Sequence, residues 1–265
     1  MKIGIIGCGN MGQALIKGLL AKGYLRSREL ICADKDKSKA NFVRLRYRVS
    51  LSSSGADLVR SCQVIILAVK PQDADALLRT MPAKLKGKLW ISICAGLTTT
   101  GLEKRLGKVA VVRAMPNMPA QALQGITALA PGRYASAKDR KAARSIFACV
   151  GEVVEVKERL MDALTAISGS GPAYFFYLTE KLIASAKKLG LSEELAQKLV
   201  RQTALGSALL IKQSAQSPQE LRQRVASKGG TTEAALKVLE KKALGKILDQ
   251  AVAAAARRSR QLRQQ

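Results

Sequence analysis

Three glycines near the start of the chain are spaced so that a backbone turn could bind a phosphate group. They belong to the segment Gly7-Cys8-Gly9-Asn10-Met11-Gly12, which follows an apolar run and precedes an amphipathic stretch. Gly7 would permit a tight turn, Gly9 would let the backbone approach a pyrophosphate, and Gly12 would allow close packing of helix on strand. The start of the next helix would add free N–H groups and a positive partial charge. The segment therefore predicts a dinucleotide-binding turn.

Charged residues of both signs follow the second apolar run, where such a dinucleotide would place its adenosine ribose. Asp34 is followed by Lys35, Asp36 and Lys37. An acidic residue here accepts hydrogen bonds from the ribose hydroxyls and favours NAD, whereas a basic residue favours the 2′-phosphate of NADP. We expect a modest preference for NADP, because Lys35 and Lys37 can reach that phosphate. NAD stays open, and an ordinary exposed turn is the alternative for Asp34.

A further apolar run ends in Ala68-Val69-Lys70-Pro71. Pro71 suits the first position of a helix, where its missing N–H costs nothing. Ligands of open α/β sheets bind beyond the carboxyl ends of the strands, so Lys70 is expected beside the cofactor. The alternative for this residue is a surface lysine.

Two glycine-bearing segments interrupt the second half of the chain. They are Ser168-Gly169-Ser170-Gly171-Pro172 and Ser227-Lys228-Gly229-Gly230-Thr231-Thr232. Each is expected to place small residues, hydroxyls and free amides at the start of a helix, which suits a carboxylate or a phosphate. Plain helix capping by Ser and Thr is the alternative. Together with the nucleotide turn, the two segments favour a small anionic substrate.

Composition excludes several kinds of chemistry. The 265 residues include no histidine, which removes His-dependent triads, His general bases and His-ligated metals. The five cysteines are widely spaced, so we expect buried, reduced thiols and no metal site. The first residues form a short apolar run in which we expect no leader segment, and the apolar runs of the chain are shorter than the ~18 residues of a membrane helix. We expect a cytoplasmic protein without a membrane partner.

The chain is strongly basic, with a formal charge of +26. Its basic residues are scattered, and only 4% of the residues are aromatic, which leaves little for stacking on bases. Nucleic acid is therefore an unlikely partner. A solvated basic surface, or steering of small anions toward a site, is the preferred interpretation.

The chain divides into two parts of different character. Strand-like and helical runs alternate over residues 1–156, and runs such as Val64–Leu67 are apolar throughout, as in strands covered on both faces. Residues 157–265 show helical patterns only. We predict an open, mostly parallel α/β sheet followed by an all-helical domain. The expected strands cover residues 2–7, 29–33, 63–68, 89–94, 109–114, 126–130 and 152–156; the expected helices cover 11–22, 35–46, 54–60, 71–80, 98–105, 135–149, 173–189, 193–213, 218–225 and 232–260.

These segments, in this order, resemble the pyrroline-5-carboxylate reductase family, the last enzyme of proline synthesis. The resemblance spans most of the chain and includes Ser92-Ile93-Cys94-Ala95-Gly96 and Val112-Arg113-Ala114-Met115-Pro116-Asn117 besides the motifs above. It implies a Rossmann-like, doubly wound dinucleotide-binding domain over residues 1–156. It also implies a helical dimerisation and substrate domain over residues 157–265. The expected activity is reduction of 1-pyrroline-5-carboxylate to L-proline by a homodimer that can join a ring of dimers.

The resemblance also assigns roles to residues. Gly7 to Gly12 and Ala68 to Pro71 would hold the dinucleotide, while Ala95 and Asn117 would border the nicotinamide. Ser227 and residues 229–232 would hold the substrate carboxylate. A cyclic imine accepts hydride well once its nitrogen is protonated, and solvent can supply that proton, so catalysis would rest on positioning. The candidate for a hydroxyl near the ring nitrogen is Thr232, the one catalytic residue we assign; the substrate-binding set is Ser227, Gly229, Gly230, Thr231 and Thr232.

The chain departs from the family pattern at three places. Lys228 stands where the family usually has proline, and Met118 stands where it usually has threonine. The acidic and basic turn at Asp34 replaces a turn that is often Asn-Arg-Ser. Lys228 leaves room for a changed loop, so a reductase of another imino or keto acid is one alternative. A non-catalytic basic nucleotide-binding protein is the other.

Overall fold

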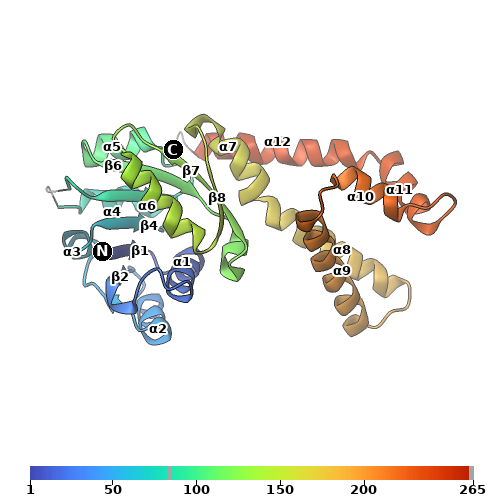
Figure 1. Cartoon of the computed structure of the whole chain (residues 1–265), viewed down its shortest axis with the longest axis horizontal. Helices are drawn as coiled ribbons and strands as arrows, with labels where there is room; N and C mark the ends of the chain where they lie inside the picture. The colour runs from blue at the N-terminus through green and yellow to red at the C-terminus, as the bar shows by residue number, and fades with distance from the viewer. Residues whose placement is uncertain (83–84, 263–265) are drawn as a thin grey trace. The chain divides into compact units, whose positions relative to one another are not determined.

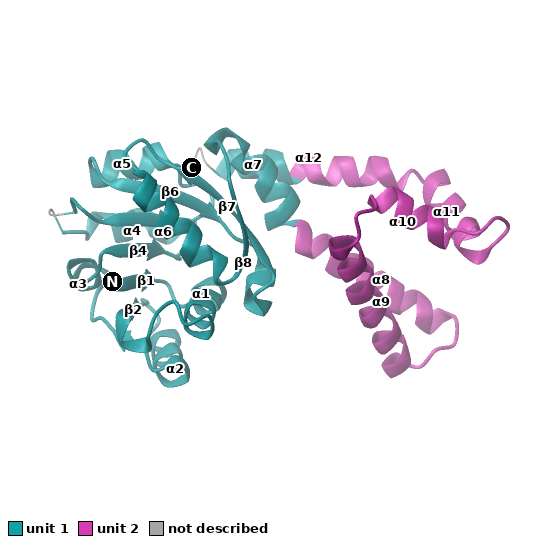
Figure 2. Ribbon diagram, in the orientation of Figure 1, with its two compact units in different colours: residues 1–170, 255–265 teal, residues 171–254 magenta. Residues whose placement is uncertain are grey.

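The computed structural model describes residues 1–82 and 85–262 (Figure 1). The described chain forms two compact units (Figure 2). The first comprises Met1–Ser170 together with the residues from Ala255 onward, and the second is Gly171–Ala254. The first unit contains the sheet, and the second is helical.

The first unit is built on an eight-stranded sheet in the order β3-β2-β1-β4-β5-β6-β7-β8. Its neighbouring strands are parallel except for the antiparallel pair β6 and β7. The strand order reverses direction between β1 and β4, which is where doubly wound sheets bind their ligands. The strands are β1 (Ile3–Ile6), β2 (Leu30–Ala33), β3 (Ser50–Leu51), β4 (Val64–Leu67), β5 (Leu89–Ser92), β6 (Ala110–Met115), β7 (Gly125–Pro131) and β8 (Gly151–Glu155).

Helices cover both faces of this sheet, which explains why its central strands are apolar throughout (Figure 1). Ile3 and Ile5 of β1 belong to one apolar cluster with α1, α2 and α6, whereas Ile6 belongs to another with α3, α4 and α5. The predicted fold class is therefore confirmed for this half. The helices are α1 (Asn10–Ala21), α2 (Lys37–Tyr47), α3 (Gly55–Ser61), α4 (Pro71–Arg79), α5 (Thr99–Leu106) and α6 (Ala137–Ala148).

The first unit continues beyond the last strand into helical structure, as expected for residues beyond 156, although no individual helix was predicted before residue 173. A 3-10 turn at Glu158–Leu160 leads into α7 (Met161–Leu164) and a π-helical turn at Thr165–Gly169. Met161 packs against Ala128 and Ala130 of β7. Within the same unit Ser259 donates a hydrogen bond of 2.8 Å to the buried carboxylate of Asp162. The end of α12 is thereby fastened to α7.

The second unit consists of helices joined by short turns. Glu193–Gln213 and Pro218–Val225 match their predicted bounds, and Ser192 is the N-cap of α9 as expected. The single helix predicted for residues 232–260 is wrong: the chain breaks at Ala243, whose φ is +52°. Alanine favours helix, so its identity gave no sign of the break. The helices are α8 (Gly171–Lys188), α9 (Glu193–Gln213), α10 (Pro218–Val225), α11 (Thr231–Lys241) and α12 (Leu244–Leu262), the last of which ends in the first unit.

The second unit buries almost nothing by itself. Gly171 and Ala196 are its only buried residues. Large apolar side chains such as Phe175 and Leu182 are about half exposed or more, at 72% and 49%. Patches of this kind on a protein surface mark contacts with other chains.

All five cysteines are buried and none of them forms a disulfide. Burial raises the pKa of the Cys94 and Cys149 thiols and raises that of Cys62 to about 11. Their interpretation as small buried apolar residues is confirmed by their burial. Across the described residues, none of the helices has the length and apolar character needed to cross a lipid bilayer.

Candidate nucleotide and substrate sites

The turn between β1 and α1 has the backbone geometry expected of a phosphate-binding turn. Gly7 adopts a φ of +111°, and a side chain there would collide with the Ala68 carbonyl. A side chain at Gly12 would collide with the carbonyl of Gly7. These two glycines are therefore required by the packing of the protein itself.

Gly9 is different, because a Cβ built on it meets no atom within 4 Å. Its φ of −71° is also open to other residues, so neither space nor strain explains a glycine here. Gly9 is the N-cap of α1, whose first amides have no helical acceptor and whose first turn carries no acidic residue. The open backbone and the free amides fit the pyrophosphate of a dinucleotide.

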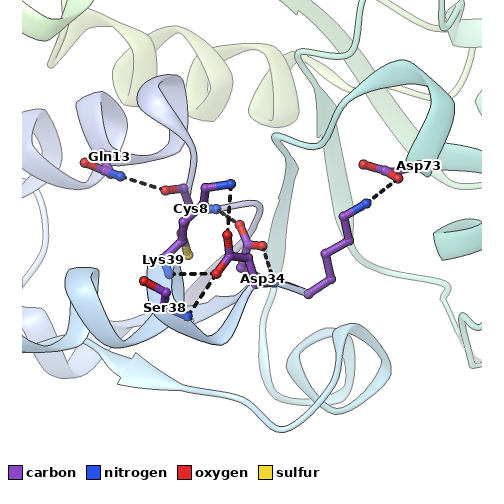
Figure 3. Close-up of polar contacts among 8 residues, drawn as sticks. Cys8, Gln13, Asp34, Ser38, Lys39 and Asp73 are labelled. Atoms are coloured by element: carbon purple, nitrogen blue, oxygen red, sulfur yellow. Dashed lines mark hydrogen bonds and ion pairs between the residues drawn. The ribbon is translucent and has the colours of Figure 1, made fainter.

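Two side chains hold the peptide groups on either side of Cys8 (Figure 3). The Cys8 N–H donates to the Asp34 carboxylate over 2.6 Å. The Gln13 side-chain amide donates to the Cys8 carbonyl over 2.8 Å. Sequence reasoning missed Gln13, since one polar residue on the first turn of an amphipathic helix carries no distinctive signal.

The turn after β2 carries its charges in pairs (Figure 3). The Lys35 ammonium lies 2.6 Å from the Asp73 carboxylate on α4, which joins the turns after β2 and β4. Asp36 is the N-cap of α2 and accepts from the amides of Ser38 and Lys39. The Lys39 side chain and these amides lower the pKa of the Asp36 carboxyl. Lys37 lies exposed at the start of α2.

The segments after β4 and β5 lie beside this turn at the same edge of the sheet. The Ala68 N–H donates to the Ile6 carbonyl over 2.8 Å, and Pro71 occupies the first position of α4, as predicted. Lys70 precedes it as the N-cap residue and is exposed. A cavity of about 520 Å³ is lined by Pro71, Ala95 and Gly96, among others. The predicted cofactor segments of β1, β2, β4 and β5 are thus neighbours in the first unit.

Asn117 also lies in the first unit, but its side-chain oxygen is already engaged. It accepts a hydrogen bond of 2.9 Å from the Ile126 N–H and so fixes the start of β7. Met118, which follows, is half exposed. The segment Met115-Pro116-Asn117 lies close to the segment Ser168–Pro172, since a Cβ added to Gly169 would come within 2.9 Å of the Met115 side chain.

The segment Ser168–Pro172 does not have the structure that we predicted from the sequence. It is not a loop with free amides at a helix start, because Ser168 and Gly169 lie in the π-helical turn and α8 follows almost at once. The Ser170 N–H donates to the Thr165 carbonyl over 2.8 Å. This segment therefore offers no anion-binding helix terminus, although π-helical turns are common at functional sites.

The segment Ser227–Thr232 does form a turn before a helix, in the second unit. Gly229 has a φ of +72°, and its N–H donates to the Glu233 carboxylate over 2.6 Å. The hydrogen bond from Gly229, together with Lys237, lowers the pKa of Glu233. The Gly230 N–H donates to the Ser227 carbonyl. Thr231 and the half-buried Thr232 occupy the first two positions of α11, where the amides have no helical acceptor.

A charged residue inside a buried strand gives a further contact that the sequence analysis did not assign. Arg113 of β6 is 2% exposed and pairs with Glu158 over 3.3 Å. Glu158 also accepts from the N–H and hydroxyl of Thr99 at the start of α5. The signal was visible, since arginine interrupts the apolar run of β6.

Comparison with known proteins agrees with both halves of the chain. Residues 158–262 match the family model of pyrroline-5-carboxylate reductase dimerisation, and residues 2–96 match a model described as NADP oxidoreductase, coenzyme F420-dependent. A pyrroline-5-carboxylate reductase of Synechocystis is 38% identical over 99% of this chain and 98% of its own length.

Solved structures give the same result. A pyrroline-5-carboxylate reductase from Coxiella burnetii is 35% identical, with a TM-score of 0.89 and coverage of 98% of each chain. A pyrroline carboxylate reductase from Plasmodium falciparum, solved with NADP bound, is 34% identical, with a TM-score of 0.87 and coverage of 99% of this chain and 98% of its own. Sequence identity, fold and the order of the site segments agree over nearly the whole length, and the chain belongs to the pyrroline-5-carboxylate reductase family.

Proposed function

We propose that this protein reduces 1-pyrroline-5-carboxylate to L-proline, the last step of proline biosynthesis, with NADPH as the preferred hydride donor. The observation that carries the proposal is the open backbone at Gly9, at the switch point of the sheet in a chain of this reductase family. It is the one glycine of the turn that the protein's own packing does not require, so a ligand accounts for it.

In the reaction, the carbon of the cyclic imine gains a hydride and its nitrogen gains a proton. When bound, the reduced nicotinamide supplies the hydride. The Gly7–Gly12 turn, with Asp34, Lys35, Ala68–Pro71, Ala95 and Asn117, would bind and orient the dinucleotide. No histidine is needed, because solvent can protonate the imine and the enzyme then works by alignment of the two reacting carbons.

The substrate carboxylate is assigned to the turn before α11. The Gly229 and Gly230 amides already donate within the turn, so the donors we propose are the amides and hydroxyls of Thr231 and Thr232. Ser227, Gly229 and Gly230 would shape the turn around them. The Thr232 hydroxyl would lie near the imine nitrogen and serve as the catalytic hydroxyl. The exposed Lys228 lies in the same turn and would affect which substrate is selected there.

The residues 1–156 would form the dinucleotide domain and residues 157–265 the dimerisation and substrate domain. The match to the family model of reductase dimerisation and the exposed apolar side chains of the second unit support a homo-oligomer. We propose a dimer as its building block, with a ring of dimers as a larger assembly, in the cytoplasm, where buried unbridged cysteines stay reduced. Light scattering on the purified protein measures the mass of the assembly.

The decisive assay follows NADPH absorbance during incubation with pyrroline-5-carboxylate and identifies proline as the product. A panel of cyclic imines and keto acids run beside it tests whether Lys228 changes the substrate. The proposal requires the five-membered imino acid to give the highest kcat/KM of the panel. Separate measurements of kcat/KM with NADPH and NADH test the cofactor preference, and a clear advantage of NADH would contradict that part.

A further inference from the structure

The carboxylate of Asp34 is used for backbone contacts rather than directed at solvent. One oxygen accepts from the Cys8 N–H over 2.6 Å, and the other accepts from the Asp36 N–H over 2.8 Å (Figure 3). Asp34 is partly buried between the two turns that it joins. Hydrogen bonds to an ionised carboxylate are the stronger kind, so they fix the side chain as well as the backbone.

The contact with Cys8 holds the peptide group that joins Gly7 to Cys8. Gln13 holds the next peptide group by donating to the Cys8 carbonyl over 2.8 Å. In a trans peptide the carbonyl and the following N–H point in opposite directions. Gln13 therefore also fixes the direction of the Gly9 N–H, in the residue where an added Cβ would meet no atom within 4 Å.

We propose that Asp34 and Gln13 are positioning residues that hold the phosphate-binding turn in its binding conformation before the dinucleotide arrives, and that Asp34 is not the residue that selects between NADH and NADPH. This inference rests on the proposed dinucleotide-dependent function. Selection at the ribose 2′ position then falls to the lysines of the same turn, of which Lys35 is held by Asp73 on α4.

The proposal and the usual role of an acidic residue at this position predict opposite results. In the usual role, the carboxylate binds the ribose hydroxyls and repels the 2′-phosphate of NADPH. Its removal then weakens NADH binding and improves NADPH binding. A residue that holds the turn weakens both cofactors, because both place their pyrophosphate on the same amides. Such a residue also stabilises the protein in the absence of cofactor, whereas a solvated side chain that contacts only the ribose does not.

The test uses the full-length protein with Asp34→Ala and Asp34→Asn. Calorimetry gives the Kd for NADPH and for NADH, and thermal unfolding gives the Tm without cofactor. For Asp34→Ala we expect both Kd values to rise at least about fivefold, with a lower Tm, because two charge-assisted hydrogen bonds are lost. Asp34→Asn keeps one acceptor oxygen and should lie between the wild type and Asp34→Ala. If the alanine variant does not fold, the asparagine variant decides.

Asp73→Asn is the matched control for charge. It also removes a carboxylate near the β2 turn, but it leaves the phosphate-binding turn untouched and releases Lys35. It should leave NADH binding unchanged and tighten NADPH binding. Opposite signs of the NADPH effect in Asp34→Ala and Asp73→Asn support the proposal, and NADPH binding that is unchanged or tighter in Asp34→Ala overturns it.

Gln13→Leu tests the second positioning residue, since it keeps the length of the side chain and removes the donor to Cys8. It should weaken both cofactors together without a change in their ratio, and unchanged binding of both would overturn the role of Gln13. Failure of the proposed function is a separate result: it would appear as a wild-type protein that binds neither cofactor. A wild type that binds NADPH, with Asp34→Ala altering only the cofactor ratio, would refute the inference alone.

Discussion

At the scale of single residues, the three glycines of the phosphate-binding turn separate into two kinds. Gly7 and Gly12 are fixed by contacts within the protein, whereas Gly9 faces open space. The sequence pattern treats the three alike, because spacing alone does not reveal what each residue meets. Only the structure shows which glycine can be replaced without loss of the fold.

Gly9→Val should leave the protein folded and weaken cofactor binding by about 100-fold, or roughly 2.8 kcal/mol at 1.4 kcal/mol per decade. The valine side chain would occupy the space where the backbone meets the pyrophosphate. Titration of cofactor against the variant gives the Kd, and circular dichroism checks the fold. Gly12→Val is the contrast, since its side chain collides with the Gly7 carbonyl and should unfold the turn. A folded Gly9→Val protein with wild-type affinity would remove the pyrophosphate from this turn.

Thr232→Val keeps the shape of the side chain and removes its hydroxyl. It should lower kcat/KM for pyrroline-5-carboxylate by roughly 10- to 100-fold, since a hydrogen bond to a charged group contributes about 1.5–3 kcal/mol. The Kd for NADPH should not change, because the phosphate-binding turn lies in the other unit. Thr231→Val, at the exposed neighbouring position, shows which of the two hydroxyls matters more. Normal substrate kinetics in Thr232→Val would place the carboxylate elsewhere.

At the scale of elements, the sequence was informative where a residue type strongly favours one position in an element. Pro71 marked the first position of α4, and Ser192 marked the N-cap of α9. Apolar runs marked every strand except β3, which is two residues long and has no pattern of its own.

The errors occurred where residue type did not indicate the backbone conformation. Ala243 takes a positive φ despite its helix propensity. The serines and glycines of residues 168–171 resemble a loop, yet they lie in a helical path. The segments of the candidate site were recognised as motifs, but Gln13 and the Asp34 contacts were not, because side-chain orientation is not encoded in spacing.

The contact between α7 and α12 gives a prediction at this scale. Ser259→Ala removes the hydroxyl that donates to Asp162 over 2.8 Å, at a site where both residues are more than nine-tenths buried. The free energy of unfolding should fall by about 1–3 kcal/mol, the usual cost of a lost hydrogen bond to a buried charged group. Denaturant unfolding measures it, with Ser259→Thr as the variant that keeps the hydroxyl. Equal stability of the alanine variant would show that Ser259 contributes nothing to the attachment of α12.

At the scale of the whole molecule, the excess of basic residues acts on anionic ligands. The formal charge is +26, and the field of such a surface attracts NADPH more strongly than NADH. Salt should therefore raise the Kd for NADPH more steeply than that for NADH, since the screening length is about 10 Å at 0.1 M. Titrations at several salt concentrations give the two slopes. Equal slopes would show that the extra phosphate gains nothing from the charge of the protein.

The exposed apolar side chains of the second unit predict dependence on self-association. The groove between α8 and α9, of about 680 Å³, is lined by Leu182, Leu199 and Ile211, among others. Leu182→Glu should reduce the mass of the assembly and lower the Tm, because burial of a leucine contributes about 1.5–3 kcal/mol. Light scattering and thermal unfolding measure the two effects. Lys198→Glu, at an exposed polar position of α9, is the control, and an unchanged mass in Leu182→Glu would exclude this groove from the interface.

The return of α12 to the first unit has a consequence for synthesis. All eight strands precede residue 156, yet Ser259, which fastens α12 to α7, leaves the ribosome after the whole of the second unit. While residues 171–254 emerge, α7 lacks the contact with Ser259. Bringing Ser259 back to α7 closes a long loop, which has an entropic cost that grows slowly with loop length. In the homo-oligomer that we propose, association of a second copy would cover the apolar side chains of the intervening helices and offset this cost. Assembly on the helical half would thereby stabilise the nucleotide-binding half through the chain that connects them, by mass action.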